Sequence, residues 1–325
     1  MQYVAPRWLP GGNLQTIWPA LYARRAEVPL PGYRRERWAT PDGDFIDVDF
    51  LDAPGAAPKP LLVLFHGLEG SSSSHYAEVF AAFAHARGWD YAVPHFRGCS
   101  GELILAPRAY HSGDFEEIGW ILARLRAQRD PGQPLLAAGV SLGGNALMRW
   151  AAEAGDTAAG CAKAVAAVCS PLDLAAGAVA IGRGFNRLVY TNMFLRSMKP
   201  KAMEKLKRHP GLFDGAKLMA ATSLHAFDDL FTAPLHGFKD ADDYYARASA
   251  RPHLRRIRIP SLALNALNDP FVPAASLPRA DEVAALVTLW QPQDGGHVGF
   301  PDGRMPGHVR TMPDEVGGWL MERIH

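Results

Sequence analysis

The chain has 325 residues, of which 48% are hydrophobic and 21% charged, and its formal net charge is +1. These values are typical of a globular protein that is long enough to bury a large α/β core, and they give no sign of a nucleic-acid partner. The three cysteines lack metal-type spacing, which argues against a disulfide scaffold and favours a reducing compartment, so we expect a cytoplasmic protein with free structural cysteines.

The first twenty residues contain Pro6, Pro10 and Pro19 and lack the continuous apolar stretch of a signal peptide. No apolar run elsewhere approaches the ~20 residues that a membrane span needs. We therefore expect neither a leader nor an integral membrane span.

Residues 33–53 alternate polar and apolar side chains around a Pro-Asp-Gly turn, which predicts an antiparallel hairpin with one solvated face. Beyond it, apolar runs typical of buried strands alternate with stretches typical of helices. The strand-like runs lie at 61–65, 91–96, 134–140, 164–174 and 259–270, and the helix-like stretches at 75–88, 113–130 and 142–155. This alternation predicts a mostly parallel sheet covered by helices on both faces, with the ligand site at the carboxyl ends of the strands.

The stretch 172–250 interrupts this alternation with helical pieces and no convincing buried strand. We interpret it as a helical cap inserted into the α/β core, so that 1–171 and 251–325 form the two parts of that core. Its large apolar side chains fit packing of the cap better than an acyl-chain channel; they are Phe185, Tyr190, Met193, Phe194 and Met198. The basic run 196–209 fits a solvated helix face better than a lipid surface.

The segment Gly139-Val140-Ser141-Leu142-Gly143 has the pattern G-x-S-x-G between a strand-like run and a helix-like one, which is the context of a nucleophile elbow. The glycines permit a tight turn that leaves the serine hydroxyl exposed at a helix N-terminus, where backbone N–H groups favour negative charge. A serine needs a base and an orienting acid to become a nucleophile, and in this architecture the acid precedes the histidine.

His297 is the favoured base among the 12 histidines, because it lies in a glycine-rich loop ahead of a possible last helix. His308 is its nearest rival. Asp269 is the favoured acid, since it follows a buried strand and Pro270 ends that strand. Two alternatives stay open for the acid: Asp173 after the preceding strand, and the pair Asp228 and Asp229.

The oxyanion hole requires two backbone N–H groups, for which we expect Leu142, next to the nucleophile, and Leu68, in the loop after the run 61–65. We interpret His66, Arg97 and His111 as residues that brace the loops of the site. Cys99 lies near the expected site but has no evident base. The run "EGSSSS" lacks the lysine of a phosphate loop, and we expect no metal and no cofactor.

These motifs together resemble the α/β-hydrolase superfamily and, within it, the YheT-like branch, to which yeast medium-chain ethanol acyltransferases and several animal lipid hydrolases are related. The resemblance extends along nearly the whole chain, through "NLQTIWP", "FHGLEGSSSSHY", "HFRGCSGE", "YHSGD", "GVSLGGNAL", "FDDLFTAPLHGF", "NDPFVP" and "GGHVGF". It implies that Ser141, Asp269 and His297 are nucleophile, acid and base. Asn268 departs from the acidic pair usual in the family, and we expect no membrane anchor such as the animal relatives carry.

The function expected from the residues and the resemblance is a serine hydrolase that cleaves small carboxylic esters, with short to medium or lipid-like acyl groups, through an acyl-enzyme. An alcohol acyltransferase would use the same residues, and a non-catalytic binding protein on the same fold is the rival of another class. The oligomeric state and the physiological ester do not follow from the sequence.

Overall fold

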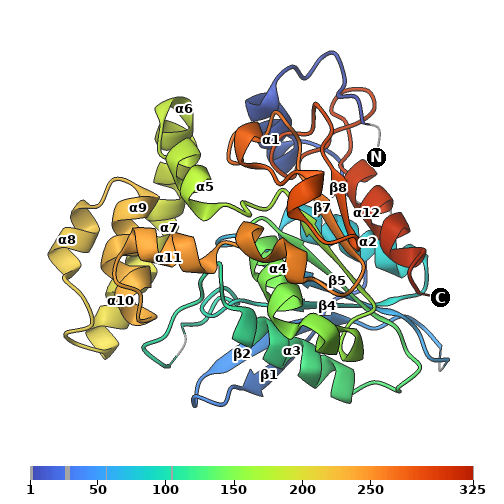
Figure 1. The fold of residues 1–325 in the computed structure, drawn as a ribbon, viewed down its shortest axis with the longest axis horizontal. Helices are drawn as coiled ribbons and strands as arrows, with labels where there is room; N and C mark the ends of the chain where they lie inside the picture. The colour runs from blue at the N-terminus through green and yellow to red at the C-terminus, as the bar shows by residue number, and fades with distance from the viewer. Residues whose placement is uncertain (1–2, 26–29, 56, 104, 325) are drawn as a thin grey trace.

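The computed structural model describes residues 3–25, 30–55, 57–103 and 105–324 of the chain. An eight-stranded sheet runs through the molecule in the order β1-β2-β4-β3-β5-β6-β7-β8 (Figure 1). The β1–β2 and β2–β4 pairs are antiparallel and the other pairs are parallel. The strands are β1 (Arg34–Ala39), β2 (Phe45–Leu51), β3 (Leu61–Phe65), β4 (Asp90–Pro94), β5 (Leu135–Val140), β6 (Ala164–Val168), β7 (Ser261–Leu264) and β8 (Val287–Trp290).

Helices cover both faces of the sheet, as the sequence predicts. Alternate side chains of the buried strands point to opposite faces, so that Leu61, Val63 and Phe65 pack with helices α3 and α4, whereas Leu62 and Leu64 pack with α2 and α12. The longer helices are α1 (Gly12–Leu21), α2 (His75–Ala86), α3 (Phe115–Ala127), α4 (Leu142–Ala154), α7 (Asn192–Arg208) and α12 (Thr311–Met321). The expected α/β class is confirmed.

The antiparallel hairpin is present as β1 and β2, but the expectation of one solvated face is wrong for β2, whose residues are all buried. The polar residues Asp47 and Asp49 alternate with apolar ones because they bind partners rather than water. Arg37 on β1 donates to Asp47 at 2.8 Å, and Arg35 donates to Asp49 at 2.6 Å. The exposed edge strand therefore covers β2 with its arginines.

Between β6 and β7 the described chain forms only helices and turns, which gather on one side of the sheet, at the left of Figure 1. Besides α7, the helices are α5 (Leu174–Ile181), α6 (Gly184–Asn186), α8 (Gly215–Ala220), α9 (Leu224–Phe227), α10 (Ala233–Leu235) and α11 (Ala241–Ala248). Two π-helical turns, Arg187–Thr191 and Asp228–Thr232, join them. Small apolar clusters hold this helical segment together, one of them around Leu195, Phe227 and Phe231.

Candidate active site

Ser141 lies in a sharp turn between β5 and α4, at the carboxyl edge of the sheet. Its backbone has φ 53° and ψ −117°, a conformation that is unusual for a residue with a side chain. The flanking glycines are sterically required: a Cβ on Gly143 would lie 2.4 Å from the carbonyl oxygen of His66, and one on Gly139 would lie 2.5 Å from the carbonyl oxygen of Gly143. The local sequence thus forces the serine hydroxyl out of the turn.

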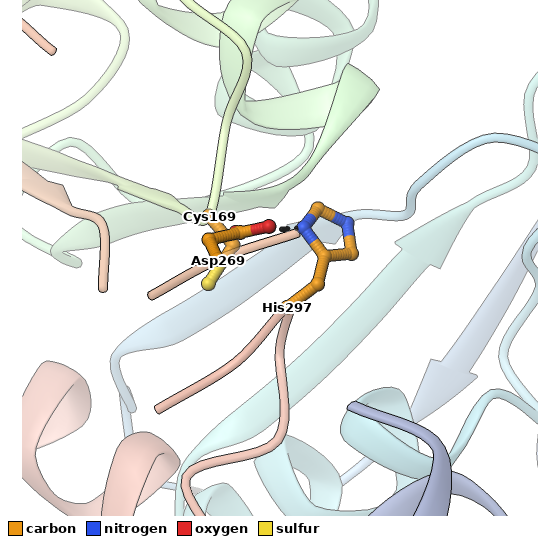
Figure 2. A group of neighbouring side chains, drawn as sticks. All are labelled: Cys169, Asp269 and His297. Carbon is orange, nitrogen blue, oxygen red and sulfur yellow. Dashed lines mark hydrogen bonds and ion pairs between the residues drawn. The ribbon is translucent and has the colours of Figure 1, made fainter. Parts of the chain in front are cut away.

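His297 connects Ser141 to Asp269 through two hydrogen bonds. Its Nε2 lies 3.1 Å from Ser141 Oγ. Its Nδ1 lies 2.9 Å from Asp269 Oδ2, and Figure 2 shows this contact between the base and the acid. A carboxylate beside Nδ1 favours the tautomer with its proton there, which leaves Nε2 to accept the serine proton. The Asp269 side chain is fully buried, and its other oxygen accepts from the backbone N–H of Phe271 at 2.7 Å. The carboxylate is therefore held in one orientation.

The alternative acids and the alternative base have other partners in the structure. Asp173 caps α5 by accepting from the Ala176 N–H, Asp228 binds Thr232 and Tyr245, and Asp229 accepts from the Ala241 N–H. His308 lies in a loop bridged to Asp302. None of these contacts is with Ser141 or His297, although Asp228 lines the same pocket as Ser141. In the described part of the chain, only Asp269 forms a hydrogen bond with His297 through a carboxylate.

Leu68 and Leu142, the expected oxyanion donors, line the same pocket as Ser141. The loop after β3 approaches the elbow closely, since a Cβ on Gly67 would lie 3.3 Å from the Ser141 Cβ. The Tyr76 hydroxyl fixes this loop by accepting from the Gly67 N–H at 2.9 Å. Among the described residues, no backbone carbonyl outside the regular helices and strands accepts from the Leu68 or Leu142 N–H.

The three residues expected to brace the loops have different surroundings. His66 is buried; its Nδ1 donates to the Gly67 carbonyl oxygen at 2.8 Å and its Nε2 accepts from the Phe96 N–H at 3.0 Å. Burial lowers the pKa of His66 to about 3, so the ring is neutral and joins the loops after β3 and β4.

Arg97 and His111 lie farther along the same loops. Arg97 pairs with Glu117 at 2.7 Å, Asp42 at 2.9 Å and Asp44 at 3.2 Å, and is almost fully buried. The His111 ring packs 4.4 Å from the His236 ring, and burial lowers its pKa to about 4. Both side chains line a second pocket, next to the one that contains Ser141.

Sequence reasoning missed the residues of α1 that hold the histidine loop. Thr16 Oγ1 accepts from the His297 N–H at 2.9 Å, and Gln15 Oε1 accepts from the Gly295 N–H at 2.8 Å. The same Gln15 oxygen accepts from Asn268 Nδ2 at 2.9 Å, so one side chain contacts both the acid loop and the base loop. In the sequence, the motif "NLQTIWP" contains both residues and contributes to the family resemblance, but it does not indicate what they do.

The Asn268 side chain binds the loop of the histidine on both sides of its amide. Its Nδ2 donates to Asp294 Oδ1 at 3.0 Å, and its Oδ1 accepts from the Gly296 N–H at 2.9 Å. An aspartate at 268 would place a second carboxylate against Asp294, whereas the amide supplies a donor there. Asparagine at position 268 is therefore compatible with the contact between the acid loop and the histidine loop.

Cys169 lies directly behind the acid and the base (Figure 2). Its Sγ accepts from the Val298 N–H at 3.2 Å and contacts the Gly296 carbonyl oxygen at 3.7 Å, so the thiol touches the backbone on both sides of His297. Burial raises the pKa of this thiol. Ligand-type atoms of Cys169, Asp269 and His297 lie within 4.8 Å of one another, but each already has a hydrogen-bond partner within the protein.

The pocket lined by Ser141 and His297 is mostly apolar. The helical segment supplies most of its wall, which includes Leu174, Ile181, Phe194, Met198 and Leu224. The polar groups of its lining include Asp228, whose pKa burial raises to about 6. The lining suits a ligand with an apolar body.

A sequence profile described as the alpha/beta hydrolase fold matches residues 60–304. The chain belongs to the α/β hydrolase superfamily. Within this superfamily it is 38% identical, over 98% of its length and 93% of the relative's, to the Escherichia coli protein named "Putative esterase YheT". Bovine "Phospholipase ABHD3" is 30% identical over 89% of the chain and 71% of its own length. The expected membership in the YheT-like branch is confirmed.

Solved structures agree on the fold. The crystal structure of 2,6-dihydroxy-pseudo-oxynicotine hydrolase superimposes with a TM-score of 0.55 at 16% identity, over 90% of this chain and 68% of that one. No helix among the described residues combines the length and the apolar character needed to cross a bilayer.

Proposed function

We propose that the protein is a serine hydrolase that cleaves carboxylic esters, with Ser141 as nucleophile, His297 as general base and Asp269 as the orienting acid. The observation that carries the proposal is the line of hydrogen bonds from Ser141 Oγ to His297 Nε2 at 3.1 Å and from His297 Nδ1 to Asp269 at 2.9 Å, on a strained elbow. The names of relatives support it, because esterase, phospholipase and monoacylglycerol lipase all describe ester hydrolysis.

The reaction follows from this geometry in two steps. His297 Nε2 takes the proton of Ser141 as its oxygen attacks the ester carbonyl carbon, and the Leu68 and Leu142 N–H groups hold the resulting oxyanion. The intermediate collapses, the alcohol leaves with the proton from His297, and Ser141 carries the acyl group. Water, activated by the same histidine, then releases the acid. Asp269 stabilises the histidine cation that forms in both steps.

The substrate class follows from the pocket. Its apolar wall favours an apolar acyl group, and we propose that the helical segment 172–250 acts as a cap that excludes water from that group. On this proposal, residues 1–171 and 251–325 form the core that carries the reacting groups, whereas the cap sets acyl preference. His66, Arg97 and His111 brace the loops between core and cap.

Fluorophosphonate labelling with an intact-mass readout tests the nucleophile. We expect the wild-type protein to gain one adduct and Ser141→Ala to gain none. Ser170→Ala is a matched control, because Ser170 follows the neighbouring strand β6 and is buried, and it should label like wild type. Turnover of p-nitrophenyl esters should then peak at one acyl length. A folded wild-type protein that neither labels nor turns over esters would favour a binding protein instead.

A further inference from the structure

The helical segment has an exposed apolar surface close to the ester pocket. Of the fourteen large hydrophobic side chains that are exposed among the described residues, five lie within residues 179–193. We call them the apolar patch: Val179, Phe185, Leu188, Val189 and Met193, with exposed fractions of 48%, 51%, 71%, 36% and 53%. Single exposed apolar residues need no explanation, but a cluster of this kind marks an interaction surface.

The charge around the apolar patch is of one sign. The stretch 174–203 contains five basic residues and no acidic residue, although the whole chain has a net charge of only +1. Lys199 and Lys201 are directed to other parts of the protein, since Lys199 donates to the Met219 carbonyl and Lys201 pairs with Glu69. Arg183, Arg187 and Arg196 are exposed and form no ion pair in the described part of the chain; Arg187 donates to the exposed Thr222 hydroxyl, at 3.4 Å. The patch is therefore apolar with a cationic border.

The apolar patch is joined to the rim of the ester pocket. Asn186 donates to the carbonyl oxygen of Pro270, next to Asp269, at 2.7 Å. The ring centroids of Phe185 and Tyr190 lie 6.2 Å apart, and those of Tyr190 and Phe271 lie 4.5 Å apart, both in an edge-to-face arrangement. Along the same helices, Ile181, Phe194 and Met198 point into the pocket. One face of α5–α7 therefore lines the pocket while the other is exposed beside its rim, where α5 and α6 project from the molecule (Figure 1).

We propose that the apolar patch docks the protein on an anionic lipid surface, with the patch side chains between the acyl chains and the three arginines among the headgroups. Arg196, at the start of the run 196–209, would then face lipid, in contrast to the solvated face expected for that run from the sequence. An apolar face bordered by cations is the arrangement that interfacial helices present to such surfaces. A second copy of the chain is less compatible, because a two-fold contact through this patch would place the arginines of both copies together without a carboxylate from this stretch. Docking would present the pocket rim to lipid-borne esters.

Vesicle flotation tests the docking, with phosphatidylcholine vesicles that contain or lack phosphatidylserine as the probe. The proteins carry Ser141→Ala so that no vesicle ester is consumed, and the result is therefore independent of the proposed hydrolysis. We expect binding that requires phosphatidylserine and weakens with added salt. Arg183→Gln should weaken the binding about fivefold, the change expected for one cation near an anionic surface.

The decisive variant is Leu188→Asp with Met193→Asp, and the matched control is Leu286→Asp with Met321→Asp, an exposed leucine and methionine outside the helical segment. We expect the first pair to reduce vesicle binding at least about tenfold and the control pair to leave it unchanged. When Ser141 is present, both double variants should turn over a water-soluble ester at the wild-type rate, which would show that the fold and the pocket are intact.

Two results would overturn the docking proposal. One is vesicle binding that is equal with and without phosphatidylserine, or that survives the Leu188 and Met193 substitutions. The other is a wild-type protein that sediments as a dimer, becomes a monomer with these substitutions and does not bind vesicles. A second copy of the chain would then cover the patch. Loss of labelling at Ser141 with vesicle binding intact would instead refute the proposed hydrolase and leave the docking standing.

Discussion

Asp269 and Asp173 both follow parallel strands of the sheet, yet their carboxylates have different partners. Asp269 binds His297 Nδ1 at 2.9 Å with a fully buried side chain, whereas Asp173 caps α5 at 3.1 Å and lies 3.6 Å from Arg251. The sequence leaves both open as the acid, because each has the same position relative to a strand. The two carboxylates can be told apart only in the folded structure, where Asp269 binds a histidine and Asp173 caps a helix.

The two aspartates provide a matched pair of substitutions. Asp269→Asn should lower kcat about 10⁴-fold, because an amide at this position no longer favours the productive histidine tautomer or stabilises its cation. Asp173→Asn should leave kcat within a few-fold, since asparagine also caps helices. Steady-state kinetics on one p-nitrophenyl ester checks both. Equal losses of activity in the two variants would contradict the assignment of the acid.

Single residues also show where sequence reasoning ends. The strand-turn-helix context and the chain order predict Ser141, Asp269 and His297, and these are the side chains that hydrogen bonds connect in the structure. Gln15, Thr16 and Cys169 could not be predicted in the same way. Their partners lie 127–281 positions away in the chain, and nothing in the local pattern indicates such contacts.

Helix α1 is the element that aligns the two loops of the site. It lies at the start of the chain, but Gln15 contacts both Asn268 and Gly295, and Thr16 holds the backbone of His297. The approach is close, since a Cβ on Gly12 would lie 1.8 Å from the carbonyl oxygen of Asn268. The alternation of strands and helices predicts the sheet well, but α1 lies outside that alternation, so its role emerges only from the packing.

Replacing Gln15 with leucine should separate alignment from folding. The leucine leaves the Gly295 N–H without its buried acceptor, which costs about 1–3 kcal/mol, and it frees the histidine loop to shift. We expect kcat to fall on the order of 10²-fold, the loss typical of a small misplacement of reacting groups, with the circular dichroism spectrum unchanged.

The control for this substitution is Gln133→Leu, another buried glutamine, which lies in the turn before β5 and, among the described residues, forms no hydrogen bond with the loops of the site. It should reduce stability without reducing kcat beyond a few-fold. A Gln15→Leu protein with wild-type kcat would show that the sheet alone aligns the loops and that α1 is dispensable for their geometry.

At the scale of the whole molecule, burial keeps several histidines neutral. Their pKa values are lowered to about 3 for His66 and His236 and to about 4 for His75 and His111. Burial has the opposite effect on two carboxyls, because it raises the pKa of Asp228 to about 6 and also raises that of Glu117. The folded core thus favours the uncharged form of both kinds of group.

These shifts predict that acid destabilises the protein. Between about pH 6.5 and pH 4 the unfolded chain binds protons at the four histidines and the folded chain does not, so the free energy of unfolding falls as the pH falls. Protonation of Asp228 and Glu117 stabilises the folded chain over part of this range, but these are two carboxyls against four histidines. We expect a loss on the order of 2–4 kcal/mol between pH 7 and pH 5, measured by urea denaturation.

A variant assigns this pH dependence to the buried rings. His66→Gln removes one titrating group from the folded core, so its stability should change less between pH 7 and pH 5 than that of the wild type, even if it is less stable at pH 7. Stability that rises on acidification of the wild type would show that the buried carboxyls dominate.

The position of α1 also has a consequence for how the protein is made. Gln15 leaves the ribosome long before its partners, because Asn268 follows it by 253 positions and Gly295 by 280. Until those loops emerge, Ser141 has no aligned base, because His297 follows it by 156 positions. If Ser141 and His297 react as proposed, a chain that stops before residue 297 carries the serine without its base, and the hydroxyl becomes reactive only after α1 has met the loop of His297.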